Sequence, residues 1–131
     1  MIAVDSSAFI AIVRQEPERD SFLDILSQAD RVLVSPATVV EARMVAHRRG
    51  GPDLVAELDV LFTTTSAEIM PIEDADLDVA HAAFVAYGRG SGHPARLNFG
   101  DLFSYALAKA RGVPLLCKGN DFARTDLTMA A

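Results

Sequence analysis

Residues 98–121, NFGDLFSYALAKARGVPLLCKGND, are the stretch that decides the fold. Asn98 is a typical N-cap residue, and the helix that it introduces is expected to end near Arg111, because Gly112 is a typical residue after a helix end. The apolar run 113–117 then predicts a buried strand, which the turn-forming residues 118–121 terminate. A helix that leads directly into a buried strand is the repeating unit of an α/β domain with parallel strands.

The same alternation of strands and helices extends over the rest of the chain. Short apolar runs predict strands at 2–4, 31–34 and 67–71, with a last short strand at 127–129. Periodicity and capping residues predict helices at 8–15, 18–29, 36–49, 52–62 and 73–87. The glycine- and proline-rich segment 88–96 predicts an exposed loop. We therefore expect an α/β domain with a short, mainly parallel sheet.

Length and composition predict a soluble intracellular protein. The chain has 131 residues, which is the size of one domain, so residues 1–131 are expected to form a single unit. Its one cysteine, Cys117, excludes an intramolecular disulfide and fits a reducing compartment. There is no signal peptide at the N-terminus and no apolar run of the roughly 20 residues that a membrane helix needs. We expect a cytoplasmic protein without a membrane contact.

The charge argues at first against a nucleic-acid partner. The chain has 18 acidic and 12 basic residues and a net charge of −6, whereas proteins that bind phosphates usually present a basic surface. This objection weakens if several of the acids are metal ligands, because bound cations reverse the local field. For most of the acids a solubilising surface remains the simpler interpretation.

Four carboxylates follow strands or begin helices at one predicted edge of the sheet. In open α/β sheets, ligands bind beyond the carboxyl ends of the strands. Asp5 follows the first strand and Asp121 follows the strand at 113–117. Asp101 opens the helix that leads into that strand, and Glu41 lies in the helix after the second strand. The topology therefore places all four near the same edge.

Each of these acids also has a structural interpretation. Asp5 is a common type of N-cap, with Ser6 and Ser7 competing for that role. Asp101 in a first helical turn favours the helix dipole, and Asp121 suits a turn. Glu41 shares a helix face with apolar residues, which favours either a paired or metal-bound carboxylate or a partly exposed residue at the edge of that face. Both interpretations stay open for each acid taken alone.

Together the four acids predict a particular chemistry. Four carboxylates without a convergent histidine or cysteine make an all-oxygen site, which suits Mg²⁺ or Mn²⁺. Such ions activate water and stabilise the leaving oxygen in phosphodiester hydrolysis. His47, His81 and His93 lack metal-ligand spacing, and no glycine-rich phosphate-binding loop is present.

Four blocks of the sequence resemble a known family over essentially the whole chain. They are residues 4–8 (VDSSA), 36–42 (PATVVEA), 97–108 (LNFGDLFSYALA) and 115–122 (LLCKGNDF). Their order and spacing are similar to those of the PIN-domain nucleases, and in particular of the VapC-type toxins of type II toxin–antitoxin pairs. The resemblance implies a PIN fold, with three α/β/α layers, and a metal-dependent endoribonuclease that leaves a 5′-phosphate.

The resemblance also implies roles and partners. Asp5, Glu41, Asp101 and Asp121 occupy the acidic positions, with Asp5 and Asp101 as the first choices for metal ligands. The implied partners are an RNA substrate, an inhibitory cognate antitoxin and a second copy in a homodimer. Asp126 is a candidate for an additional acid. Ser6 either caps the first helix, which we favour, or hydrogen-bonds a ligand carboxylate.

Several basic residues are candidates for contacts with RNA phosphates or with the antitoxin. They are Arg43, Arg48, Arg49, Arg89, Arg96 and Lys118. Arg96 and Lys118 are preferred because they flank the acidic blocks, and the loop 88–96 is a candidate for a flap that faces RNA or a partner. The alternatives to a ribonuclease are a DNA-directed nuclease and a non-catalytic module that binds an antitoxin in operon repression. A receiver-like domain is disfavoured, because Asp5 has no adjacent acidic residue.

Overall fold

The computed structural model describes residues 1–131 as alternating strands and helices. The elements are β1 (Ile2–Val4), α1 (Ser6–Val13), α2 (Arg19–Gln28), β2 (Val32–Val34), α3 (Pro36–Thr64), β3 (Glu68–Ile69), α4 (Asp74–Tyr87), α5 (Phe99–Arg111), β4 (Leu115–Leu116) and the 3₁₀ helix η1 (Phe122–Arg124). These bounds confirm the predicted α/β pattern to within a few residues. The strand expected at 127–129 is only a single bridge between Met129 and Leu115. None of the helices has the length and apolar character that crossing a bilayer requires.

All four strands are parallel, in the order β3-β2-β1-β4. The chain moves from β1 outward through β2 to β3 and then returns to place β4 on the other side of β1. The strand order therefore reverses between β1 and β4. In open parallel sheets, the carboxyl ends of the strands at such a reversal are the usual position of a binding site.

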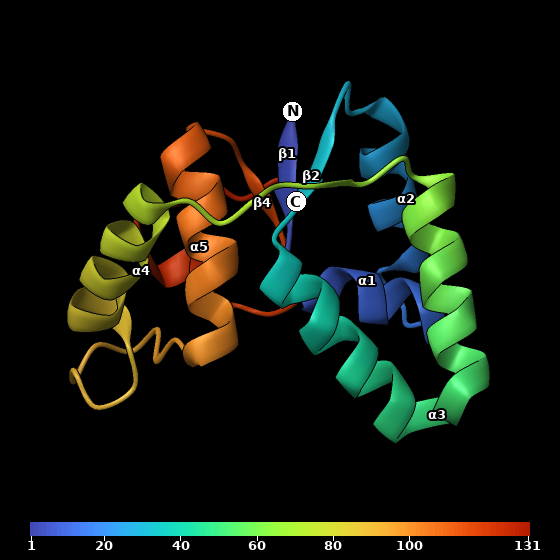
Figure 1. Ribbon diagram of the computed structural model, residues 1–131, viewed down its shortest axis with the longest axis horizontal. Helices are drawn as coiled ribbons and strands as arrows, with labels where there is room; N and C mark the ends of the chain where they lie inside the picture. Colours follow the sequence, from blue (N-terminus) through green and yellow to red (C-terminus); the bar gives the residue numbers. More distant parts are fainter.

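The two faces of the sheet are covered by different helices, which makes three layers (Figure 1). The strand residues packed with α1, α2 and α3 are Ile2, Val4, Val32, Val34 and Leu116. The strand residues packed with α4 and α5 are Ala3, Leu33 and Leu115. This alternation follows from the two-residue period of a strand, and it confirms the α/β/α arrangement.

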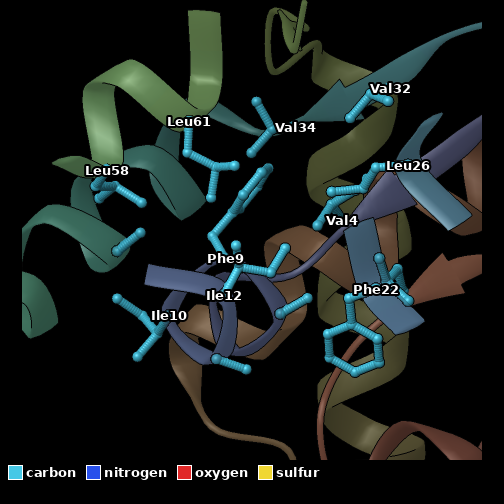
Figure 2. Close-up of a cluster of buried hydrophobic side chains, with 14 of the residues drawn as sticks. Val4, Phe9, Ile10, Ile12, Phe22, Leu26, Val32, Val34, Leu58 and Leu61 are labelled. Carbon is cyan, nitrogen blue, oxygen red and sulfur yellow. The ribbon is translucent and has the colours of Figure 1, made fainter. Parts of the chain in front are cut away.

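The core on the first face is centred on Phe9 of α1. Phe9 has no exposed surface and points toward Val34 and Leu61 (Figure 2). Its ring also meets the ring of Phe62 edge to face, with the centroids 4.7 Å apart. Burial of side chains of this size stabilises the fold by about 1.5–3 kcal/mol each. This packing fixes α1, and with it the residues at the start of α1.

The two helices expected at 36–49 and 52–62 are the two arms of α3. They meet at Gly51, whose φ of 67° and ψ of −161° are not helical. Glycine adopts this conformation without the steric cost that a Cβ brings, and Pro52 begins the second arm, where its missing N–H costs little. Figure 1 shows that the first arm extends beyond the carboxyl ends of the strands, so that the kink lies far from the sheet.

Two predicted caps differ in detail. Asp5 rather than Ser6 or Ser7 caps α1, which begins at Ser6 instead of Ala8. Ser35 stands at the N-cap of α3, as expected from Ser35-Pro36, but its hydroxyl makes no capping hydrogen bond. The proline at the first helical position, with φ fixed near the helical value, is sufficient to start this helix.

Candidate active site

Asp5 lies at the carboxyl end of the central strand β1, next to the reversal in strand order. It is 3% exposed and accepts hydrogen bonds on both oxygens. Oδ2 accepts from the backbone N–H of Ser7 at 3.1 Å and from its hydroxyl at 2.7 Å, and Oδ1 accepts from the hydroxyl of Ser104 at 2.6 Å. Asp5 therefore caps α1 and also faces the edge of the sheet, so the two interpretations of this residue are compatible.

Two buried hydroxyl groups form a hydrogen-bonded chain that ends at Asp5. Ser104 of α5 and Thr38 of α3 are each 1% exposed, and their hydroxyl oxygens are 3.1 Å apart. Since the single hydroxyl proton of Ser104 is donated to Asp5, Ser104 accepts the proton of Thr38. The carboxylate is thus held by α1, α5 and α3 together. Sequence reasoning missed both hydroxyls, and their only signal was a polar residue within an otherwise apolar helix face.

Asp101 opens α5 in a reciprocal cap with Asn98. The backbone N–H of Asn98 donates to Asp101 Oδ2, and the backbone N–H of Asp101 donates to Asn98 Oδ1, both at 2.9 Å. Burial raises the pKa of Asp101 from 3.8 to about 6; the Asn98 hydrogen bond opposes this, and the negative charges of Asp5, Glu41 and Asp121 add to it. The acid is therefore a helix cap and a member of an acidic cluster.

Glu41 projects from the first arm of α3 against the start of α5. Its Oε1 accepts a hydrogen bond of 2.6 Å from the hydroxyl of Ser6. The favoured expectation for Ser6 was therefore wrong: it bonds a carboxylate and does not cap α1. The other oxygen, Oε2, lies so close to Gly100 that a Cβ at that position would overlap it. Met44, on the same helix face, is 54% exposed, so this face is not buried within the chain.

Asp121 and Cys117 complete the surroundings of the cluster. Asp121 is exposed, lies at the start of η1 and makes no side-chain hydrogen bond as its cap. Its charge acts on Asp101 and also on Cys117, at the end of β4. Burial, together with the charges of Asp5, Asp101 and Asp121, raises the pKa of the Cys117 thiol to about 12. The thiol is therefore protonated at neutral pH and is a poor nucleophile.

The geometry agrees with comparisons to known proteins. The sequence model of the PIN domain matches residues 2–127 of the chain. The chain belongs to the PIN-domain family. Among similar proteins, ribonuclease VapC28 of Mycobacterium tuberculosis is 42% identical over 127 residues, which cover 97% of this chain and 96% of that protein.

Solved structures support the same fold for this PIN domain. VapC20 of Mycobacterium tuberculosis, described as a sarcin-ricin loop cleaving toxin, superposes with a TM-score of 0.77 at 17% identity, covering 98% of this chain and 97% of the other. A toxin–antitoxin complex from Klebsiella pneumoniae gives a TM-score of 0.71 at 17% identity, over 94% and 91% of the two chains. At these identities the structures establish the fold alone.

The oxygen donors of the PIN domain suit a hard divalent cation. No group of three or more His, Cys, Asp or Glu side chains is arranged to hold an ion by itself. Mg²⁺ does not need such a cage, because it is usually held by one or two carboxylates, with water and substrate phosphates as the other ligands. Asp101 Oδ1 and Glu41 Oε2 make no hydrogen bond within the chain, so each has its lone pairs free.

Two further candidates have side chains that form ion pairs. Asp126 accepts hydrogen bonds from Tyr105 at 2.6 Å and from Lys109 at 2.7 Å, one and two turns beyond Asp101 along α5. Lys118 is bound to Glu16 at 2.7 Å and to Glu18 at 3.0 Å. The structure thus places Asp126 apart from the four acids and neutralises Lys118 with two carboxylates.

Proposed function

We propose that this PIN domain is a metal-dependent endoribonuclease that acts as the toxin of a toxin–antitoxin pair. The observation that carries the proposal is the gathering of Asp5, Glu41, Asp101 and Asp121, from four separate segments, around the switch point of a parallel sheet. Burial is the main cause of the raised pKa of Asp101, and the negative charges of Asp5, Glu41 and Asp121 add to it, because carboxylates brought close together repel one another. A divalent cation relieves that repulsion and binds the phosphate oxygens of a nucleic acid.

Asp5 and Asp101 are the proposed ligands of Mg²⁺ or Mn²⁺, with Glu41 and Asp121 completing the site. When bound, such a cation supplies charge neutralisation and the activation of water. The chain supplies orientation: Ser7 and Ser104 fix Asp5, and Ser6 fixes Glu41. With a pKa of about 6, Asp101 is mostly ionised at neutral pH and is available as a ligand.

Water is the nucleophile that this arrangement favours. The Cys117 thiol stays protonated, and the hydroxyls of Ser6, Ser7 and Ser104 each donate to a carboxylate. None of these hydroxyls forms a hydrogen bond with a histidine, so there is no serine–histidine pair of the kind that activates a hydroxyl. Direct hydrolysis without a covalent enzyme intermediate follows from this arrangement.

The relatives support the RNA substrate and the antitoxin partner. VapC28 is named a ribonuclease, VapC20 is described as cleaving the sarcin-ricin loop, and the Klebsiella pneumoniae structure is a toxin–antitoxin complex. We transfer from these proteins the substrate class, RNA, and the kind of partner, an antitoxin that blocks the site.

The test is cleavage of total cellular RNA by the purified protein, free of antitoxin, with Mg²⁺, with Mn²⁺ or with EDTA. We expect cuts at discrete sites that require the metal and disappear in Asp5→Asn. Asp78→Asn, which removes an exposed acid of α4, is the matched control and keeps full cleavage. Equal cleavage by Asp5→Asn and the control rules out the assigned site.

A non-catalytic, antitoxin-binding module is the alternative, because no three acids form a closed metal site. A folded protein that binds its antitoxin, but cuts neither RNA nor DNA with either metal, establishes this alternative. Cleavage of DNA in preference to RNA instead retains the site and changes its substrate.

A further inference from the structure

Half of the cationic side chains of this acidic protein have no acidic partner. Of the 12 lysines and arginines, six lie within 4.0 Å of a carboxylate oxygen. The remaining six are all arginines: Arg48, Arg49, Arg89, Arg96, Arg111 and Arg124. None of these six arginines forms an ion pair, although the charge of Arg49 acts at longer range on Glu16.

Four of the six unpaired arginines belong to two segments that lie toward the end of the molecule that holds the four acids. Arg48 and Arg49, here called the arm arginines, end the first arm of α3 beside its kink. Arg89 and Arg96, the loop arginines, belong to the segment between α4 and α5. Figure 1 shows the kink and this segment on opposite sides below the sheet, with the start of α5 between them. Arg111, in contrast, ends α5 at its far end.

The loop arginines are held in place by backbone contacts. The N–H of Arg89 donates to the carbonyl of Leu97 at 3.0 Å, and that of Leu97 donates to Tyr87 at 2.9 Å, which closes the segment into a loop. Arg124 of η1 donates to the carbonyl of Pro94 at 3.2 Å and ties the loop to the segment that carries Asp121. The loop therefore has a fixed position beside the acidic cluster.

The backbone at Arg96 supports a functional role for this position. Its φ is +50°, in the left-handed region that side chains other than asparagine, aspartate and glycine rarely adopt. A side chain keeps this conformation only where the surrounding structure imposes it, and such positions are common at functional sites. Arg96 is exposed, two residues before the Asn98 cap that positions Asp101.

We propose that the arm arginines and the loop arginines form the two sides of a track for the RNA backbone. The strand crosses the acidic cluster, and the phosphates on either side of the one being cleaved bind these guanidinium groups. The proposal rests on the proposed ribonuclease function and adds the substrate-binding surface.

The chemistry of the site favours a phosphodiester strand as the occupant of this track. Guanidinium groups bind phosphate oxygens in a bidentate manner and keep their charge at any physiological pH. The four carboxylates repel a polyanion, so the attraction has to come from the flanks, which is where the unpaired arginines lie. Contacts of this kind position a strand without reading its sequence.

The experiment measures RNA binding in the Asp5→Asn background, which leaves the strand uncut. A fluorescent single-stranded RNA of mixed sequence is titrated by anisotropy with Mg²⁺ present, over a series of NaCl concentrations. The variants are Arg48→Gln/Arg49→Gln and Arg89→Gln/Arg96→Gln. Arg111→Gln is the control, because it removes one unpaired arginine at the far end of α5; net charge alone would give it about half the effect of a pair variant, which removes two.

Each pair of substitutions is expected to weaken binding and to flatten its salt dependence, whereas the control does neither. For a single strand, the slope of log K against log salt changes by about 0.7 for each phosphate contact that is lost. The loss of both contacts on one side therefore changes the slope by about 1.4.

Three results overturn the track. If Arg111→Gln has about half the effect of each pair variant, net charge explains the binding. If only one pair matters, the strand does not cross the site between two sides. If RNA binding is unchanged but binding of an antitoxin is lost, the arginines serve a protein partner.

Failure of the proposed function gives a different result. The RNA can bind with the predicted salt dependence while the unsubstituted protein never cleaves it with either metal. In that case the proposed RNA track is supported and the proposed nuclease function is wrong. If cleavage occurs normally in both pair variants, the nuclease stands and the track fails.

Discussion

At the residue scale, the buried Asp5 depends on a hydroxyl that comes from 99 positions away in the sequence. Asp5 accepts three hydrogen bonds, and no cation pairs with it, so the loss of Ser104 leaves a buried charge with fewer donors. We expect Ser104→Ala to lower the free energy of unfolding by roughly 1.5–3 kcal/mol, because the hydrogen bond involves a charged group. Denaturant unfolding in EDTA measures this loss.

Thr38→Val is the matched variant, since it keeps the shape of the side chain and removes only the hydroxyl. It breaks a bond between two neutral groups and leaves the Ser104–Asp5 bond in place, so we expect a smaller loss, of about 0.5–1.5 kcal/mol. A Thr38→Val loss as large as that of Ser104→Ala contradicts the proposed direction of the hydrogen bonds.

The pKa of Asp101 predicts how the metal-free protein responds to pH. The Asp101 carboxyl group has a pKa of about 6 in the folded protein, whereas in the unfolded chain its pKa is near 3.8. The stabilisation is therefore complete below pH 3.8 and is lost as the pH rises through about 6. The side chain in Asp101→Asn cannot ionise, so this variant does not lose that stabilisation. In EDTA, the unfolding free energy of Asp101→Asn should therefore rise relative to that of the unsubstituted protein as the pH increases from 3.8 to about 6.

Denaturant unfolding of both proteins across this pH range is the measurement. Addition of Mg²⁺ above pH 6 should selectively stabilise the unsubstituted protein, because a ligand that binds the folded state shifts the equilibrium toward it. Curves that stay parallel from low to neutral pH show that Asp101 titrates normally.

At the element scale, α3 and α5 meet where Glu41 lies against Gly100. In a helix, replacing glycine by alanine normally stabilises the helix by up to about 1 kcal/mol. Here a Cβ at position 100 overlaps the Glu41 carboxylate, so we expect Gly100→Ala to destabilise the protein and to displace Glu41. In a Glu41→Ala background the overlap is gone, and the same substitution should stabilise by up to about 1 kcal/mol.

A double-mutant cycle on unfolding free energies checks this contact. An equal effect of Gly100→Ala in both backgrounds means that the two helices do not meet through this pair. The unsubstituted protein and Asp78→Asn are the references for cleavage, which Gly100→Ala should lower together with stability.

At the scale of the whole molecule, the site concentrates negative charge in a protein that already has a net charge of −6. Without a divalent cation the four acids repel RNA, so we expect Asp5→Asn/Glu41→Gln to bind RNA more tightly than the unsubstituted protein in EDTA. Anisotropy titrations at constant ionic strength measure this difference. Asp74→Asn/Asp78→Asn on α4 removes the same charge from exposed positions and should have a smaller effect. Equal effects point to net charge alone.

Local sequence signals determined most of the architecture. Apolar runs, periodicity and capping residues act over a few residues, which is why the bounds of β1 and α5 and the parallel sheet were predicted correctly, whereas the strand expected at 113–117 is limited to Leu115–Leu116. The four acids were also predicted at one edge, because the carboxyl ends of parallel strands must meet there. The exceptions were at the ends of elements, such as residues 127–129, where a single bridge replaces a strand.

The tertiary structure alone decided which side chains meet. Ser104 with Asp5, and Ser6 with Glu41, are 99 and 35 positions apart, and each pair depends on how two helices pack on a sheet. The sequence therefore favoured capping for Ser6 and gave Ser104 no role. Packing likewise pairs Lys118 with two glutamates and leaves the arm and loop arginines unpaired, because a charge is neutralised only by the groups that the fold brings within reach.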